Sequence, residues 1–354
     1  MSRVLAGPLC SMILGDLGAN VIKVERPGVG DDTRGWGPPF DARGESAYFM
    51  SINRNKRSLA ADLDRDEDRA LLLRLIAEAD VVIENFLPGA LTRKGLDADR
   101  LLSENPRLIW CSIRGYDGDH ARPGYDFAVQ AEAGWMSVTG DPGGAPMKTA
   151  VALVDVLTGK DAAIAVLAAL VGGRGGPPRT RRLTLTLTGS AAAALVNVAQ
   201  NTLVSGQEAG RWGNAHANLV PYQLFQAADR PLVIAVGSDA QWEALCALLG
   251  DPAITHEAAW LRNAGRVRDR DRCVAALQAI LLQRTAADWV RDCRAAGVPV
   301  GLVRTVSEAL EGMHASPLTG VPSSVGGTVR RVPPRLGEHT AEVRTHGWRA
   351  IEAN

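Results

Sequence analysis

The sequence predicts an α/β protein, with a mostly parallel sheet in a large first domain and a smaller α/β domain after it. Two observations lead to this prediction. In the first half, short apolar runs typical of strands alternate with longer segments whose apolar residues recur at helical spacing. The chain also has 354 residues. That is too many for one ordinary core, since a domain usually takes about 150 residues.

Three helix-then-strand units make up the first half of the predicted fold. Each helix has apolar side chains on one face, and each strand is a short apolar run of the kind that is buried on both faces of a parallel sheet. Strands joined by helices in this way run parallel and are covered by the helices. In chain order the units are helix 8–17 with strand 21–24, helix 67–79 with strand 80–86, and helix 97–103 with strand 108–115.

The middle of the chain predicts a long helix, followed by a strand and a second helix. Residues 155–171 are almost all apolar, which predicts a helix buried on most sides. Residues 183–188 alternate in the manner of a strand, and residues 190–204 return to a helical pattern. We therefore predict these divisions: a large domain over 1–205, a linker over 206–220, a small α/β domain over 221–318, and a segment over 319–354 that returns to the large domain.

Composition excludes several classes of partner. The 39 basic and 39 acidic residues cancel, so the whole molecule has no field that attracts nucleic acid or an anionic membrane. No apolar run reaches the length of about 18 residues that a membrane span needs, and the first residues lack a secretory cleavage pattern. The five cysteines are scattered, without metal-ligand spacing. We expect a cytoplasmic protein with reduced thiols and no bound metal.

Familiar nucleotide and hydrolase motifs do not occur. The sequence has no GxGxxG opening a helix after a strand, and no GxxxxGK[ST], HExxH or GxSxG. These absences argue against a dehydrogenase, a kinase, a metallohydrolase and a serine hydrolase.

Asp155 is the first candidate for chemistry. It follows the strand-like run AVALV and opens the long apolar helix. It could be an ordinary N-cap that accepts a backbone N–H. Alternatively, the helix N-terminus could keep its carboxylate ionised in a partly buried site, where it could attack a thioester carbonyl. The sequence leaves both readings open.

Other candidates lie where strands end. Arg26 follows the first strand and could bind a phosphate, and Asn85 and Phe86 follow strand 80–86. The loop 27–40 is long enough to suggest a function. The basic cluster at 53–57 also suits phosphate, although most such clusters are solvated surface. His216 lies in a segment rich in Trp, Asn and Tyr, where it could contact substrate or be purely structural.

Taken together, these segments resemble the class III CoA-transferases. The match extends over nearly the whole chain in about nine segments. The sequences of the segments GDDTRGWGPPF and RWGNAHANLVPYQ are most similar to those of the succinate–hydroxymethylglutarate type, whose substrates are dicarboxylates. The segments that carry the resemblance are VLAGPLCSMILGDLGANVIKVERPGVGDDTRGWGPPF, ESAYFMSINRNKRS, DVVIENFLPGAL, NPRLIWCSIRGY, RPGYDF, ALVDVLTG, RWGNAHANLVPYQLF, AGVPVG and PPRLGEHT.

The resemblance implies a Rossmann-like large domain and an interlocked homodimer. It implies that Asp155 is a covalent nucleophile in a ping-pong reaction, with a coenzyme A thioester as substrate and no permanently bound cofactor. The partners it implies are an acyl-CoA and a carboxylic acid. The positions matching the family's CoA contacts are Leu5, Ala6, Arg26, Ala61, Asp62, Leu63, Asp64, Asn85, Phe86, Leu87 and Arg93.

Tyr125 favours a transferase within this family. The related 2-methylacyl-CoA racemases carry at this position a histidine that works as an acid and base. Tyrosine, with an ordinary pKa near 10, replaces it poorly. Tyr125 and His216 are tentative substrate contacts, and a racemase remains the alternative.

The chain departs from the family pattern in its first residues. Family members usually have a strand of up to about ten residues directly before the VLAGP motif, which here begins at Val4. Without that strand, a sheet edge would be exposed and helix 8–17 poorly covered. Asp64 stands where a lysine often contacts the CoA phosphates, although Arg65 could compensate. The turn after 115–116 and the stretch 312–333 are also short. These departures leave a non-catalytic CoA-binding relic as another alternative.

Overall fold

The computed structural model describes residues 1–173, 180–312 and 325–352, which fall into two units. The first unit comprises Met1–Met136, Lys148–Ala209 and the described residues of 314–354. The second comprises Ser137–Met147 and the described residues of 210–313. Residues 137–147 fall within the predicted large domain of residues 1–205, whereas here they belong to the second unit. The predicted boundary at 318 and much of the short stretch 312–333 lie outside the described residues.

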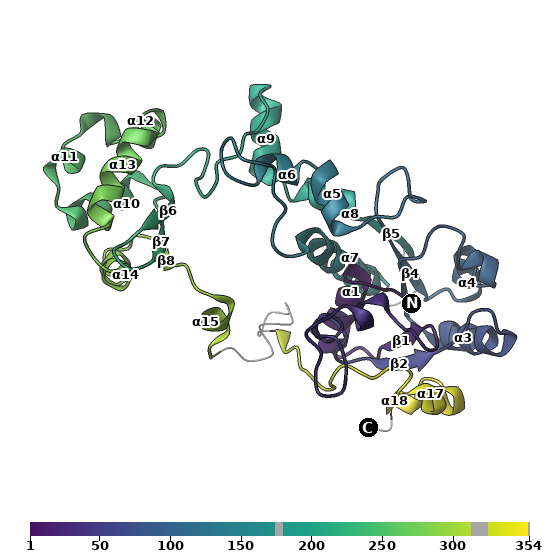
Figure 1. The fold of residues 1–354 in the computed structure, drawn as a ribbon. Coiled ribbons are helices and arrows are strands. Elements are labelled where there is room, and N and C mark those ends of the chain that lie inside the picture. Colours follow the sequence, from purple (N-terminus) through teal and green to yellow (C-terminus); the bar gives the residue numbers. More distant parts are fainter. Residues whose placement is uncertain (174–179, 313–324, 353–354) are drawn as a thin grey trace. The chain divides into compact units, whose positions relative to one another are not determined.

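The strands of the first unit are all parallel to their neighbours, but they form two sheets (Figure 1). One is the pair of β1 (Ile22–Glu25) and β2 (Arg57–Ala60). The other has the order β3 (Val81–Glu84), β4 (Ile109–Arg114) and β5 (Arg182–Thr186). The predicted parallel pairing is therefore confirmed, while the strands belong to two sheets and not to one.

Helices alternate with these strands as the apolar spacing predicts. The three predicted helix-then-strand units are present, with ends that differ from prediction by one or two residues. The predicted helix 190–204 is divided into two shorter helices. The helices before residue 206 are α1 (Ala6–Asp16), α2 (Ala47–Ser51), α3 (Asp66–Glu78), α4 (Ala98–Glu104), α5 (Asp126–Glu132), α6 (Trp135–Val138), α7 (Leu153–Gly172), α8 (Leu187–Ala193) and α9 (Val196–Ser205), and α17 (Thr340–His346) and α18 (Arg349–Glu352) follow near the C-terminus.

Helices α1 and α7 pack together in the main core of the first unit. Nearly every residue of α1 is buried, so the expectation that helix 8–17 would be poorly covered is wrong. The close approach depends on Gly159, where a Cβ would lie 2.7 Å from the backbone oxygen of Ala6. A second apolar cluster joins α3, α4 and β2. The contact at Gly159 holds the first half of α7 against the start of α1.

The long helix α7 is buried on one face only, contrary to prediction. Its buried residues include Val154, Asp155, Gly159 and Val166, whereas Ile164 and Val171 are exposed. The predicted strand over AVALV is also wrong, because the helix already begins at Leu153. Alanine and valine suit either structure, so a short apolar run could not decide between them.

The second unit is built on an antiparallel sheet, which corrects the prediction of an α/β domain. Its order is β6 (Tyr222–Gln226), β7 (Pro231–Ala235) and β8 (Val300–Leu302). The helices pack on the sheet around Trp242, Leu277 and Trp289. They are α10 (Asp239–Leu249), α11 (Pro252–Thr255), α12 (Asn263–Arg268), α13 (Arg270–Leu281) and α14 (Ala286–Ala295). The short helix α15 (Val306–Leu310), which has no buried residue, follows β8.

Candidate active site

Asp155 is the third residue of α7, within its first turn. Ala152 occupies the N-cap position, and its own side chain makes no capping hydrogen bond. The reading of Asp155 as an N-cap is therefore wrong. The residue is only 9% exposed. Its carboxylate is held inside the protein at the positive end of a helix dipole.

Asp126 binds the backbone donors of this turn. Its Oδ2 accepts the N–H groups of Val154, at 2.8 Å, and of Asp155, at 3.1 Å. The other carboxylate oxygen accepts from the amide of Gln130, whose own oxygen accepts from the backbone N–H of Thr149. Because α5 and α7 are linked in this way, the two carboxylates are held beside each other.

This arrangement makes Asp155 an unusual carboxylic acid. Burial, and then the negative charge of Asp126, raise its pKa from 3.8 to about 7. Both effects disfavour the charged form. The expected stabilisation by the helix N-terminus does not prevail, because Asp126 accepts the nearest N–H groups. With a pKa of about 7 the buried carboxyl can ionise near neutral pH, so it can be a nucleophile without remaining strongly solvated.

The charges of these two carboxylates also affect the pKa of Tyr48. Burial, followed by the charges of Asp155 and Asp126, raises its pKa to about 12. The phenol therefore remains a hydrogen-bond donor at all ordinary pH values. Its helix α2 is capped by Ser46, whose hydroxyl accepts the backbone N–H of Tyr48. The ring also meets Trp36 edge-on, with centroids 5.0 Å apart.

Leu5 and Ala6 come close to the Asp155 helix. Both are buried at the start of α1. The contact at Gly159 brings α1 against α7 one turn after Asp155. Two positions nominated from the sequence thus share a core with the candidate nucleophile.

Arg26 and Asn85 lie at the carboxyl ends of β1 and β3. Arg26 is exposed and contacts Asp32 at 3.3 Å, and Arg3 contacts the same carboxylate at 2.7 Å. Asn85 uses both ends of its amide on the backbone of Arg3, donating at 2.8 Å and accepting at 3.0 Å. The structure therefore gathers two guanidinium groups at this edge, whereas the Asn85 amide is engaged in holding residue 3.

The segment Ala61–Asp64 follows β2 at the same edge. Ala61 is buried and its N–H binds Glu25, while Asp62 accepts from the backbone of Asp64. Asp64 is exposed and forms an ion pair with Lys94. The family often has a lysine at position 64. Here Lys94, from another segment, brings an amino group to the same place.

Four other nominated side chains of this edge differ in burial. Leu63 and Phe86 are partly buried and pack on the cluster of α3 and α4. Leu87 and Arg93 are exposed. A ligand at this edge would therefore meet both apolar and basic surface.

The basic cluster at 53–57 is structural, so its reading as a phosphate site is wrong. Lys56 is buried and donates to backbone oxygens of Pro8 and Ile52 and to Asn53. Burial holds the pKa of this amine well below its usual value. Arg54 pairs with Asp16 at 3.0 Å. The sequence could not show this, because burial of a lysine depends on distant segments.

Tyr125 and His216 have different settings. Tyr125 immediately precedes α5 and is 59% exposed. His216 is partly buried in the second unit, where its Nδ1 accepts the N–H of Asn218 and its ring lies near Tyr222.

Some general expectations can also be compared with the structure. All five cysteines are free and buried, which confirms the prediction of reduced core thiols. Within residues 1–173, 180–312 and 325–352, no group of three or more His, Cys, Asp or Glu side chains is arranged to hold a metal ion. In the same part of the chain, no helix combines the length and apolarity needed to cross a bilayer.

Sequence reasoning missed Asp126, Gln130 and Tyr48. Asp126 and Tyr48 lie inside segments that carried the family resemblance, and Gln130 lies three residues after one of them. Asp126 has the sequence context of an ordinary first-turn acid of α5. Nothing in its spacing connects it to a helix that begins 27 residues later, at Leu153. Only the fold shows that these groups meet.

Comparisons with known proteins point to one family over nearly the whole chain. The model of CoA-transferase family III matches residues 1–346. The chain is 40% identical to a succinate–glutarate CoA-transferase of Agrobacterium fabrum, over 97% of this chain and 92% of that protein. It is 37% identical to the succinyl-CoA:glutarate CoA-transferase of Mus musculus, over 97% and 83% of the two chains. A crystal structure of a CaiB/BaiF family protein from Brucella suis superposes with a TM-score of 0.84 at 38% identity, covering 98% and 96% of the chains.

Proposed function

Since the chain belongs to CoA-transferase family III, we propose that it moves coenzyme A from a dicarboxylyl-CoA such as succinyl-CoA to a second dicarboxylic acid, with Asp155 as the covalent nucleophile. The relatives act on acyl-CoA and carboxylic acid pairs, as their names state. The observation that carries the proposal is the buried Asp155 carboxylate, with its pKa raised to about 7. A desolvated carboxylate of raised pKa is a stronger nucleophile than a solvated one.

The proposed reaction begins with attack on the thioester. An oxygen of Asp155 bonds to the acyl carbonyl carbon, the carbon–sulfur bond breaks, and CoA leaves as the thiolate. The product on the enzyme is a mixed anhydride. The thiolate then attacks the Asp155 carbonyl carbon, which forms an aspartyl–CoA thioester and releases the first acid as its carboxylate.

The second half reverses these steps with the acceptor. Its carboxylate attacks the aspartyl thioester and expels the CoA thiolate, which leaves a new mixed anhydride. The thiolate attacks the acceptor's acyl carbon, so that the new acyl-CoA leaves and the Asp155 carboxylate is restored. Tyr48 supports this scheme, because a phenol that remains protonated can donate to an oxyanion near the two carboxylates.

Coenzyme A itself is proposed to bind along the carboxyl ends of β1, β2 and β3. The exposed cations Arg26 and Arg93 would contact its phosphates, and Lys94 beside Asp64 would add a third charge. The partly buried Phe86 offers an aromatic surface next to them. No metal is needed in this scheme, because the carboxylate supplies covalent catalysis and the thiolate is the leaving group.

A homodimer is part of the proposal. Helix α9 has no buried residue, and its Val196, Leu203 and Val204 are all more than two-thirds exposed. On α7, Ile164 and Val171 are exposed as well. An apolar surface of this kind typically marks an interface, and a second copy of the chain would cover it.

The test follows CoA between two acids. The protein is incubated with succinyl-CoA and ¹⁸O-labelled glutarate, and mass spectrometry measures glutaryl-CoA and label in the peptide that contains Asp155. We expect transfer and labelling with the natural chain and neither with Asp155→Ala. Asp271→Ala is the matched control, because this aspartate is also in the first turn of a helix but is exposed. Transfer that persists in Asp155→Ala would rule out the covalent role.

The same samples discriminate the alternatives. A racemase would exchange the α-proton of a 2-methylacyl-CoA in deuterated water without an acceptor acid. A non-catalytic relic would bind CoA in calorimetry and give no glutaryl-CoA.

A further inference from the structure

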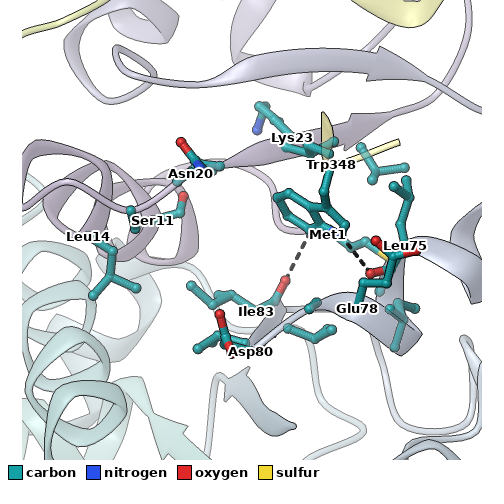
Figure 2. Close-up of a pocket in the computed structure, with 18 of the residues that line it drawn as sticks. Met1, Ser11, Leu14, Asn20, Lys23, Leu75, Glu78, Asp80, Ile83 and Trp348 are labelled. Carbon is teal, nitrogen blue, oxygen red and sulfur yellow. Dashed lines mark hydrogen bonds between the residues drawn. The ribbon is translucent and has the colours of Figure 1, made fainter. Parts of the chain in front are cut away.

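A small pocket lined by three arginines lies at the amino ends of β1 and β2, the opposite edge of that sheet from the proposed CoA site. The arginines are Arg57, the first residue of β2, and Arg330 and Arg331 of the C-terminal segment (residues 325–352). We call it the three-arginine pocket. Its remaining lining residues are Asn55 and the residues Ala19, Asn20 and Val21, which also line a larger groove between β1 and β3 (Figure 2).

Asn55 and the end of α1 hold the C-terminal segment in this place. The Oδ1 of Asn55 accepts the backbone N–H groups of Arg330, at 2.7 Å, and Arg331, at 2.8 Å. The backbone N–H of Asn55 donates to the oxygen of Arg331 at 3.1 Å. One Nη of Arg330 donates to the oxygens of Gly15 and Ala19, at 2.8 Å each. The backbone that carries these two guanidinium groups is therefore fixed against the first unit.

Arg57 is the buried member of the three. Only 3% of it is exposed, and one Nη donates to the oxygen of Ala350 at 3.1 Å. Its Nε is buried and has no hydrogen-bond partner among the described residues. In this respect Arg57 differs from Arg54 and Lys56 of the same basic cluster, whose charged groups are bonded within the protein. A buried cationic N–H without an acceptor costs free energy, so we expect an acceptor in the pocket.

The pocket also gathers positive charge away from water. In the part of the chain that the structure describes, none of the three guanidinium groups forms an ion pair with a carboxylate. Burial, and then the charge of Arg331, lower the pKa of Arg57. Glu342 opposes this effect and Arg330 adds to it. An anion in the pocket would balance these charges.

The size of the pocket limits which anion can enter. Its volume is about 10 Å³, which is roughly the space that a single water molecule needs by this measure. A phosphate or a carboxylate has several heavy atoms and needs more room. A halide ion is close to water in size and accepts N–H groups from several directions. Water would also fit, but it would leave the charges of the arginines unbalanced.

We propose that the three-arginine pocket binds a chloride ion, which accepts from the Nε of Arg57 and from the guanidinium groups of Arg330 and Arg331. The ion links β2 to the C-terminal segment. That segment also bonds to β2 through His339, whose N–H donates to the oxygen of Ser58 at 3.0 Å. The site contains no residue of the proposed CoA transfer, so it stands or fails independently of the role of Asp155.

Thermal unfolding of the full chain tests the site with matched arginine variants. Arg331→Gln should fold, because the Arg331 side chain has no hydrogen-bond partner among the described residues and its backbone makes the contacts to Asn55. Arg107→Gln is the control, since this exposed arginine also lies just before a strand, β4, and outside the pocket. Chloride is varied against isethionate at constant ionic strength.

We expect chloride to raise the unfolding temperature of the natural chain and of Arg107→Gln to a saturating value. Arg331→Gln should need about tenfold more chloride for half of the effect, because a charge-assisted hydrogen bond is lost. Arg331→Lys retains the charge and should recover part of the loss. Equal chloride dependence in the natural chain and Arg331→Gln would overturn the proposal.

Crystals of the full chain grown in bromide test the position of the ion. We expect an anomalous scattering peak within hydrogen-bond distance of the Arg57 Nε. A pocket that holds water and no bromide would refute the proposal. So would phosphate that stabilises the natural chain in the same saturable manner and loses this effect in Arg331→Gln, since that result would identify an oxyanion site. Neither experiment measures CoA transfer.

Discussion

At the scale of single residues, the central feature is a pair of neighbouring carboxylates with unequal roles. Asp126 accepts two backbone N–H groups from the first turn of α7. In the part of the chain that the structure describes, the Asp155 carboxylate accepts no such N–H groups. It is buried beside that negative charge, which is why its pKa rises to about 7. The environments of the two groups, more than their chemical type, make Asp155 the candidate nucleophile.

The first prediction concerns pH and Asp126. In the proposed reaction only ionised Asp155 attacks the thioester, so kcat/KM should rise with pH and reach half its maximum near pH 7. Asp126→Asn retains an oxygen for the helix N–H groups but removes the charge that raises the pKa of Asp155. The midpoint should then move down by about one pH unit. Asp161→Asn is the control, because that carboxylate lies on the same helix and instead accepts from Ser190. An unchanged midpoint in Asp126→Asn would contradict this account.

The second prediction concerns stability and Asp155. A carboxyl whose pKa is raised from 3.8 to about 7 on folding favours the folded state below pH 3.8. That contribution is lost as pH rises through about 7. At pH 8 the free energy of unfolding of Asp155→Asn should therefore exceed that of the natural chain by on the order of a few kcal/mol. Urea unfolding measures this difference. The difference should shrink toward pH 5. Asp271→Asn, at an exposed first-turn aspartate, should show no such dependence. A destabilised Asp155→Asn at pH 8 would argue against the burial cost.

At the scale of helices and strands, the site depends on how α1 approaches α7. Glycine at position 159 lets the two helices come together beside Ala6. Lys56 then joins the start of α1 to the end of α2 by donating to Pro8 and Ile52. Both contacts fix elements that carry site residues, namely Leu5, Tyr48 and Asp155.

The third prediction tests this approach with two glycines of the same helix. In Gly159→Ala the new methyl group would lie 2.7 Å from the Ala6 oxygen, so the helices must move apart. We expect a loss of about 1–3 kcal/mol of stability and a fall in kcat of about tenfold as Asp155 shifts. Gly172→Ala meets no atom within 4 Å and should leave both unchanged. Thermal unfolding and the glutaryl-CoA assay measure the two effects, and equal behaviour of the two variants would refute the role of the close approach.

At the scale of the whole molecule, the first unit has apolar side chains of helix α9 on its surface. Helix α9 has no buried residue although valine and leucine recur along it. A helix of this length gains most of its stability from packing. A partner surface is therefore expected, and a second copy of this chain is our proposal.

The fourth prediction tests that assembly. Leu203→Lys combined with Val204→Lys places two charges on exposed apolar positions of α9 and should convert a dimer into a monomer in sedimentation velocity. Leu282→Lys, an exposed leucine of the second unit, should leave the dimer intact. A natural chain that sediments as a monomer at micromolar concentration would disprove the proposal.

The sequence by itself determined the local elements and the family. Apolar spacing placed the three helix-then-strand units of the first half to within one or two residues, because those periods depend only on neighbouring side chains. It did not indicate β2, and it joined α8 and α9 into one helix. Ordered segments carried the family resemblance, which the family-model match over residues 1–346 confirms. Asp155 and the CoA-contact positions were nominated from that resemblance, and they stay predictions.

Only the tertiary structure decided which side chains meet and which are buried. It placed Asp126 on the α7 turn, buried Lys56 in the core and separated β1 from β3 by a groove. It also made the small sheet antiparallel and left one face of α7 exposed. Each of these outcomes depends on contacts between residues far apart in the chain, and periodicity in a single sequence contains no information about such contacts.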